Sequence, residues 1–161
     1  MRFFNTAGPI KPEIHYCVPM LDRLDLGYIL PLIEQQKYFV LHAPRQTGKT
    51  SCLLALMRHL NATGQYRCVY INVELAQSAR ENVDAAMRAI LNEIASGAAW
   101  AIGDDFPNKH RAEILTESGG HAALQQILSL WSQNDPRPVV LLVDEIDSLD
   151  RKSTRLNSSH T

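Results

Sequence analysis

The sequence predicts an α/β fold in which helices cover both faces of a parallel sheet, giving three layers. Two observations indicate this fold. Short apolar runs rich in strand-forming residues alternate with longer segments whose apolar residues recur at helical spacing. In addition, two of the apolar runs end directly in polar residues that can bind ligands. Ligands of parallel α/β sheets bind beyond the carboxyl ends of the strands, so the two observations agree.

The elements can be placed from hydrophobic spacing and from glycine and proline positions. Pro31 should kink the first helix or delay its start, and Gly64 should follow the end of the second helix. The expected elements are, in order, a helix over 25–36, a strand over 38–42, a helix from the following loop to about residue 60, a strand over 68–73, a helix over 79–95, a loop with at most a short helical turn over 96–117, a helix over 121–133 and a strand over 139–143.

A glycine-containing loop separates the strand at 38–42 from the helix after it. The order of strand, loop and helix, with Gly-Lys-Thr at the junction, predicts a phosphate-binding loop. Backbone N–H groups ahead of a helix form a concave anion site, and the helix dipole strengthens it. The residues expected to bind the nucleotide are Ala43, Pro44, Arg45, Gln46, Thr47, Gly48, Lys49, Thr50 and Ser51.

Three residues of this loop have specific expected roles. Gly48 lets the backbone approach the phosphates without a Cβ. The Lys49 ammonium would reach the β- and γ-phosphates, and the Thr50 hydroxyl would ligate Mg²⁺. Ala43 departs from the usual pattern, which opens with glycine, so this position should keep a negative φ. The alternative is a Gly-Lys-Thr turn that binds no ligand.

The strand at 139–143 delivers two carboxylates to its carboxyl end. Asp144 would hold Mg²⁺ through its water shell, and Glu145 would act as the base that orients and deprotonates the attacking water. Glu145 and Lys49 are thus the expected catalytic residues, and Asp144 and Thr50 are the expected Mg²⁺ ligands. The two motifs, in this order, predict a nucleoside-triphosphatase.

These residues carry a resemblance to a known family. The segments at 41–50 and 141–147, with Phe4-Asn5-Thr6-Ala7-Gly8-Pro9 and Lys37-Tyr38-Phe39, are similar to a bacterial AAA-like ATPase of the P-loop superfamily over about residues 1–149. The resemblance implies the P-loop NTPase fold, ATP and Mg²⁺ as ligands, and hydrolysis coupled to a conformational change. A signalling switch with little turnover and a small-molecule kinase are alternatives; Glu145 disfavours the switch, and the Asp-Glu pair disfavours the kinase.

The segment 150–161 resembles one translated frame of a sequencing adapter, so we interpret it as non-native and exclude it from the fold. The expected organisation is then an irregular segment and helix over 1–36, an incomplete ATPase core over 37–149, and this tail. In the family that the chain resembles, a further strand follows the Asp-Glu strand in the sequence. In the sheet it lies between the Asp-Glu strand and the strand that leads into the phosphate loop. The fold would therefore be truncated after the Asp-Glu strand, and the 161-residue chain should be insoluble or molten with little ATPase activity.

Composition restricts the remaining classes of function. Of 16 basic residues three lie after residue 150, so residues 1–150 carry 13 bases against 17 acids, a net charge of −4. Without a basic stripe, direct nucleic-acid binding is not expected. No apolar run is long enough to span a membrane. Three cysteines without metal spacing indicate reduced thiols in a cytoplasmic protein. No feature indicates a protein partner or an oligomeric state.

Overall fold

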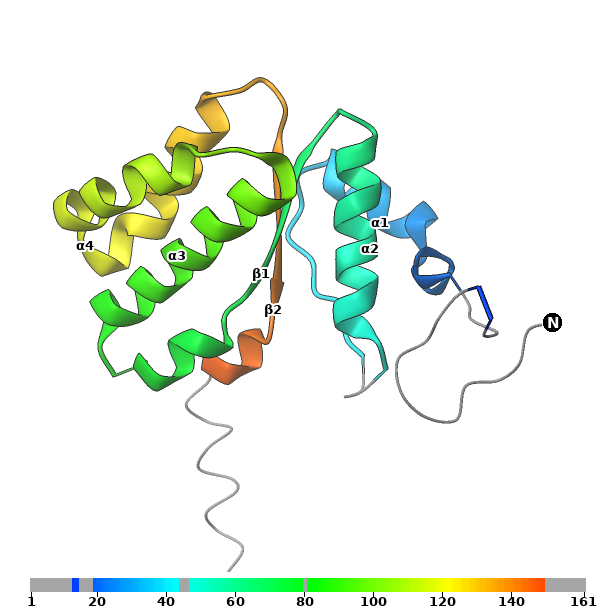
Figure 1. Cartoon of the computed structure of the whole chain (residues 1–161), viewed down its shortest axis with the longest axis horizontal. Coiled ribbons are helices and arrows are strands. Elements are labelled where there is room, and N and C mark those ends of the chain that lie inside the picture. Colours follow the sequence, from blue (N-terminus) through cyan, green and yellow to red (C-terminus); the bar gives the residue numbers. More distant parts are fainter. Residues whose placement is uncertain (1–12, 15–18, 44–46, 80, 150–161) are drawn as a thin grey trace, which may run out of the picture. The chain divides into compact units, whose positions relative to one another are not determined.

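The computed structural model describes residues 13–14, 19–43, 47–79 and 81–149. The chain divides into two compact units, Met1–Ala55 and Leu56–Thr161, and each is described by itself. Helix α2 (Lys49–Ala62) begins in the first unit and ends in the second. Figure 1 shows the elements coloured along the sequence. Residues 1–12 and 15–18 of the segment expected over 1–36, and the tail from residue 150, lie outside the described residues.

Helix α1 (Leu26–Glu34) is the main element of the first unit. Asp25 caps its N-terminus, because Oδ1 of this side chain accepts the backbone N–H of Tyr28 at 3.2 Å. Ile29 and Ile33 are buried and lie four residues apart, which places them on one face of the helix. The predicted helix is therefore confirmed, with each end one or two residues shorter than expected.

The predicted strand at 38–42 is wrong: these residues form neither helix nor strand. Their exposure does alternate, with Tyr38 and Val40 at 104% and 70% exposed and Phe39 and Leu41 half-buried. Alternation of exposed and half-buried side chains is typical of a strand. A strand also needs a hydrogen-bonded neighbour, however, and the described residues supply none to this segment.

The sheet belongs to the second unit and consists, within the described residues, of β1 (Arg67–Asn72) and β2 (Val139–Asp144). The two strands run parallel, with Val69 opposite Leu141 and Asn72 opposite Asp144. Both strands were predicted, each within one residue of its observed ends. The α/β class and the parallel pairing are confirmed, whereas the described residues show two strands and not a three-layer sheet.

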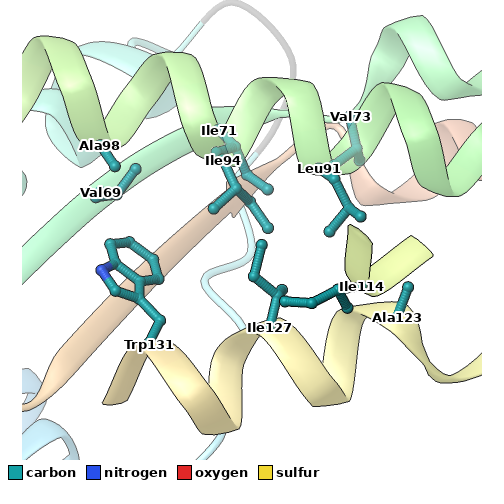
Figure 2. Close-up of a cluster of buried hydrophobic side chains, with 10 residues drawn as sticks. All are labelled: Val69, Ile71, Val73, Leu91, Ile94, Ala98, Ile114, Ala123, Ile127 and Trp131. Atoms are coloured by element: carbon teal, nitrogen blue, oxygen red, sulfur yellow. The ribbon is translucent and has the colours of Figure 1, made fainter. Parts of the chain in front are cut away.

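Helices α3 (Val83–Ile102) and α4 (Phe106–Gln133) lie on one side of the sheet (Figure 1). Alternate side chains of β1 point toward α3, whose buried residues in turn face α4 (Figure 2). The buried apolar cluster they form consists of Val69, Ile71, Val73, Leu91, Ile94, Ala98, Ile114, Ala123, Ile127 and Trp131. This core packs against one face of the sheet, so the even-numbered side chains of both strands point to the other face.

Gly97 allows α3 to lie directly on β1. A Cβ at this position would lie 2.8 Å from Cγ1 of Val69 and 3.0 Å from the carbonyl oxygen of Tyr70. Real Cβ atoms essentially never come as close as 2.8 Å to another atom. The helix would therefore have to move away from the strand to admit any side chain here.

The loop predicted at 96–117 is also wrong, because most of it is helical. Helix α3 continues to Ile102 and is ended by Gly103, whose φ of 63° is left-handed. Helix α4 starts three residues later, where Asp104 accepts the N–H of Phe106 at 2.9 Å. The expected boundary near residue 120 marks a real break inside α4, since Gly119 has a non-helical φ of 71° and ψ of 168°.

A buried arginine, Arg67, anchors the amino ends of both strands. Arg67 is 1% exposed, and its guanidinium donates to three backbone carbonyls, those of Arg137 at 3.0 Å, Trp131 at 3.1 Å and Asp135 at 3.3 Å. Its Nη1 also lies 3.6 Å from Oδ2 of Asp104. The buried charge is therefore compensated by an acid and by three carbonyls.

Asp104 and a second acid, Asp135, complete this network. Asp104 accepts the indole N–H of Trp131 at 2.8 Å. On the surface, Asp135 and Arg137 form an ion pair at 2.7 Å, and the Arg137 hydrogen bonds hold the pKa of the Asp135 carboxyl well below its usual range. All of these contacts lie at the amino ends of the strands, away from the end that carries Asp144.

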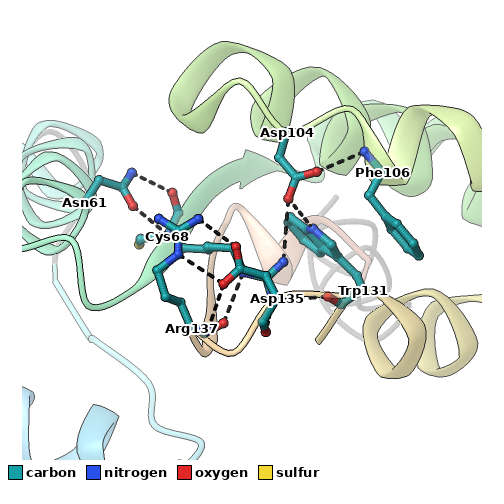
Figure 3. A network of polar contacts seen from close by, with 8 residues as sticks. Asn61, Cys68, Asp104, Phe106, Trp131, Asp135 and Arg137 are labelled. Carbon is teal, nitrogen blue, oxygen red and sulfur yellow. Dashed lines mark hydrogen bonds and ion pairs between the residues drawn. The ribbon is translucent and has the colours of Figure 1, made fainter. Parts of the chain in front are cut away.

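The side chain of Asn61, in the last turn of α2, pairs with the backbone of β1 (Figure 3). Its Nδ2 donates to the carbonyl of Cys68 at 2.8 Å, and its Oδ1 accepts the N–H of Cys68 at 2.7 Å. Cys68 itself is fully buried, and burial raises the pKa of its thiol to about 12. One amide side chain thus satisfies both backbone groups of a strand residue.

Candidate functional site

The glycine of the predicted phosphate loop lies where α2 begins. Gly48 has a left-handed φ of 81°, which favours glycine at this position. Its carbonyl accepts the N–H of Cys52 at 2.9 Å, so α2 starts with Lys49 and Thr50 in its first turn. The N–H groups of a first helical turn have no acceptor inside the helix and attract anions.

The remaining predicted loop residues are placed as follows. Thr47 is half-buried just before Gly48, and Ser51 is exposed in the first turn of α2. Ala43 is exposed and lies outside any helix or strand. Residues 44–46, which comprise Pro44, Arg45 and Gln46, lie outside the described residues.

An arginine that the sequence did not single out lies against this glycine. Arg23 is the last residue of a short 3-10 helix, η1 (Met20–Arg23). A Cβ on Gly48 would lie 2.9 Å from Nη1 of Arg23. The guanidinium therefore occupies the space next to residue 48 and adds a second cation near Lys49.

A pocket of about 460 Å³ adjoins this arrangement within the first unit. Its wall comes from η1, from α1, from residues 41–43 and from the first turns of α2. The polar and aromatic side chains in the wall are Arg23, Asp25, Tyr28, His42, Thr47 and Lys49. A pocket that combines cations at a helix N-terminus with an aromatic ring and apolar residues suits an anionic ligand with a flat ring system.

The other predicted half of the site lies in the second unit, at the carboxyl end of β2. Asp144 is 1% exposed and accepts two hydrogen bonds, from the Tyr70 hydroxyl to Oδ2 and from the backbone N–H of Glu145 to Oδ1, both at 3.0 Å. Glu145 is exposed, and its φ of 60° is left-handed, which is uncommon for a residue with a side chain. The strand end thus presents one fixed and one solvent-facing carboxylate.

Sequence reasoning missed Tyr70 and Arg23. Tyr70 lies in β1, two residues before the strand end and on the same sheet face as Asp144, because partners in register share a face and Leu142 is its partner. The parallel pairing of 68–73 with 139–143 would have pointed to it. No motif in the sequence links residue 23 to residue 48.

A family model described as an AAA ATPase domain matches residues 20–159. The chain belongs to this family. No curated protein and no solved structure shows a significant similarity to it. The matched span of this AAA ATPase domain includes both the Gly-Lys-Thr motif and the Asp-Glu motif.

Family membership points to nucleotide binding and to ATPase activity for the AAA ATPase domain. Among the described residues, no helix combines the length and the apolar character that crossing a bilayer requires. The same residues contain no group of three or more histidine, cysteine or acidic side chains arranged to hold a metal ion.

Proposed function

We propose that this AAA ATPase domain binds ATP with Mg²⁺ at the N-terminus of α2 and hydrolyses it, coupling the cycle to a conformational change. The observation that carries the proposal is the local geometry of Gly48. Its left-handed φ, followed at once by Lys49 and Thr50 in the first turn of α2, is the backbone arrangement that a phosphate loop needs. Family membership supports the same reading.

In this proposal the first turn of α2 binds the phosphates. Its N–H groups and dipole attract the anion, and the Lys49 ammonium neutralises charge on the terminal phosphates. Arg23 adds a second positive charge beside Gly48. The pocket of about 460 Å³ accommodates the nucleoside.

The residues present suit Mg²⁺. Thr50 offers a hydroxyl and Asp144 a carboxylate, and Mg²⁺ prefers oxygen ligands with several waters retained. Tyr70 and the Glu145 N–H fix the orientation of the Asp144 carboxylate, as outer partners of metal ligands commonly do. When bound, the ion would neutralise charge that develops on the phosphate oxygens.

Glu145 is the proposed general base. Its exposed carboxylate follows directly after the fixed Asp144, and the left-handed backbone at Glu145 sets the direction in which its side chain leaves the strand. It would orient the attacking water and accept its proton. A residue with an uncommon backbone conformation next to a buried acid is typical of functional sites.

Two substitutions in the full-length protein test the proposal. Lys49→Ala should abolish ATP binding or weaken it severely, measured by calorimetry, because it removes the main charge on the terminal phosphates. Lys37→Ala, at an exposed lysine outside the pocket, is the matched control. Equal ATP affinity in Lys49→Ala and wild type would overturn the site.

Glu145→Gln tests the chemical step. Glutamine is nearly isosteric but cannot accept the proton, so Mg-ATP binding should persist while turnover slows by roughly two or more orders of magnitude. Glu74→Gln, an exposed glutamate after β1, should leave turnover unchanged. Unchanged turnover in Glu145→Gln would show that Glu145 is not the base.

A further inference from the structure

The N-terminal wall of the pocket carries three polar or aromatic side chains, those of Arg23, Asp25 and Tyr28. Arg23 lies against Gly48, where the phosphates are proposed to bind. Asp25 follows two residues later, and its Oδ1 accepts the backbone N–H of Tyr28, which lies one turn further along the chain. A nucleotide offers three groups of matching chemistry, which are its phosphates, its ribose and its base.

We propose that Asp25 accepts hydrogen bonds from the ribose hydroxyls and that the Tyr28 ring stacks on the base. The site then selects ribonucleotides over nucleotides that lack these hydroxyls. This inference rests on the proposed function, because it assumes that the phosphates bind at the start of α2.

The chemistry of Asp25 fits the sugar and not the phosphates. Asp25 is the only carboxylate among the described residues that line the pocket, and a carboxylate repels phosphate. Ribose hydroxyls are uncharged donors that a carboxylate binds well. One oxygen, Oδ1, is used to cap α1, while Oδ2 accepts no hydrogen bond from the described part of the chain. The capping bond also fixes the side chain, so the second oxygen is held in one direction.

The position of Tyr28 fits a base. Its side chain is 67% exposed although it lines a pocket, so a large aromatic surface faces solvent. Apolar side chains of Leu24, Ile29 and Leu41 line the same pocket. A base that stacks on this ring and contacts these neighbours would remove that surface from water, and aromatic side chains bind bases in this way in many nucleotide sites.

The decisive measurement compares two ligands on wild-type full-length protein by calorimetry. ATP should bind about tenfold or more tightly than 2′,3′-dideoxyATP, because the loss of both hydroxyls leaves Asp25 without its partners. Asp25→Ser retains a good helix cap but is too short to reach the sugar. In this variant the affinity ratio should fall to near one, through weaker binding of ATP. Asp22→Ser, at an exposed acid in η1 that does not line the pocket, is the matched control and should keep the wild-type ratio.

Tyr28 is tested separately. Tyr28→Ala should weaken both ligands by about tenfold, whereas Tyr28→Phe keeps the ring and should bind both ligands as wild type does. Loss of affinity in Tyr28→Phe equal to that in Tyr28→Ala would contradict stacking.

The outcomes separate this inference from the proposed function. If wild type binds ATP, loses it in Lys49→Ala, and yet binds 2′,3′-dideoxyATP equally well, the ribose assignment is overturned and the proposed function stands. If wild type binds neither ligand, the proposed function itself fails. The comparison of the two ligands on wild type decides the ribose assignment even if Asp25→Ser does not fold.

Discussion

The Tyr70 hydroxyl donates a hydrogen bond to Oδ2 of Asp144 at 3.0 Å, from one parallel strand to its neighbour. The second oxygen of the same carboxylate accepts the N–H of Glu145. Asp144 is buried, so its direction is set by these contacts more than by solvent. Tyr70 is thus a positioning residue for a carboxylate that we propose to act on Mg²⁺.

Tyr70→Phe should therefore change the dependence on Mg²⁺ more than the affinity for nucleotide. Removal of the hydroxyl leaves the Asp144 carboxylate less well oriented, and outer partners of metal ligands typically contribute about ten- to a hundredfold in metal affinity or activity. We expect the Mg²⁺ concentration for half-maximal turnover to rise within that range, measured by ATPase assays across a Mg²⁺ titration. ATP binding without Mg²⁺ should be unchanged.

Tyr66→Phe is the control for this variant, since Tyr66 precedes β1 and is half-buried as Tyr70 is. If both variants shift the Mg²⁺ dependence equally, the effect is general destabilisation and not orientation of Asp144.

Arg67→Lys should be strongly destabilising in spite of the conserved charge. A lysine ammonium cannot reproduce the planar fork that donates to the carbonyls of Trp131, Asp135 and Arg137. It would leave Asp104 and those carbonyls poorly paired, and disruption of a buried pair costs about 3–5 kcal/mol. Urea unfolding should show a much smaller change for the exposed Arg137→Lys; equal losses would mean that the fork geometry is unimportant.

Gly97→Ala should destabilise the second unit although alanine is the better helix former. The added Cβ would lie 2.8 Å from Val69 and 3.0 Å from the Tyr70 carbonyl, so α3 must move off β1. Overpacking of this kind costs about 1–3 kcal/mol. In contrast, a Cβ on Gly27 would meet only an ordinary 3.4 Å contact, so Gly27→Ala should be neutral or stabilising in the same denaturant titration.

The Cys68 thiol should resist alkylation until the protein unfolds. Burial raises its pKa from 9.0 to about 12, so at pH 9 the thiolate falls from about half of the molecules to about one in a thousand. Because the folded-state pKa is the higher one, Cys68 stabilises the fold fully below pH 9, and this contribution is lost as the pH rises from 9 toward 12.

Two measurements check this prediction. Mass spectrometry after iodoacetamide treatment at pH 9 should show Cys68 labelled in urea but not in buffer. The difference in stability between wild type and Cys68→Ala should also shrink between pH 9 and pH 11. Rapid labelling of Cys68 in the native state would contradict its burial.

Local sequence patterns correctly predicted those strands that have a pairing partner in the fold. The apolar, β-rich runs at 68–73 and 139–143 form strands because each finds the other. The run at 38–42 is also apolar, yet it is not a strand, since pairing depends on a neighbour that a local pattern does not contain. The error at 96–117 has a different cause. Helix α3 continues through Gly97, where the lack of a side chain allows close packing on β1, a contact that a local pattern does not contain.

The candidate site also combines residues that local motifs predict with residues that only the fold brings together. The glycine at the start of α2 and the acids after β2 follow from motifs that are contiguous in sequence. Arg23 and Tyr70 act across 25 and 74 residues respectively, through contacts that only the folded chain creates. The solubility expected for the 161-residue chain stays a prediction.

The pairing of Asn61 with Cys68 has a consequence for how the sheet can grow. Any strand that approached β1 from its free side would first have to displace an amide that already makes both backbone hydrogen bonds there. The cost of that exchange disfavours addition of a strand at Cys68, much as natural sheets protect their edges. Within the described chain, the outer edge of β2 has no such block. A third strand, from this chain or from another, would therefore add more easily beside β2, the strand that carries Asp144.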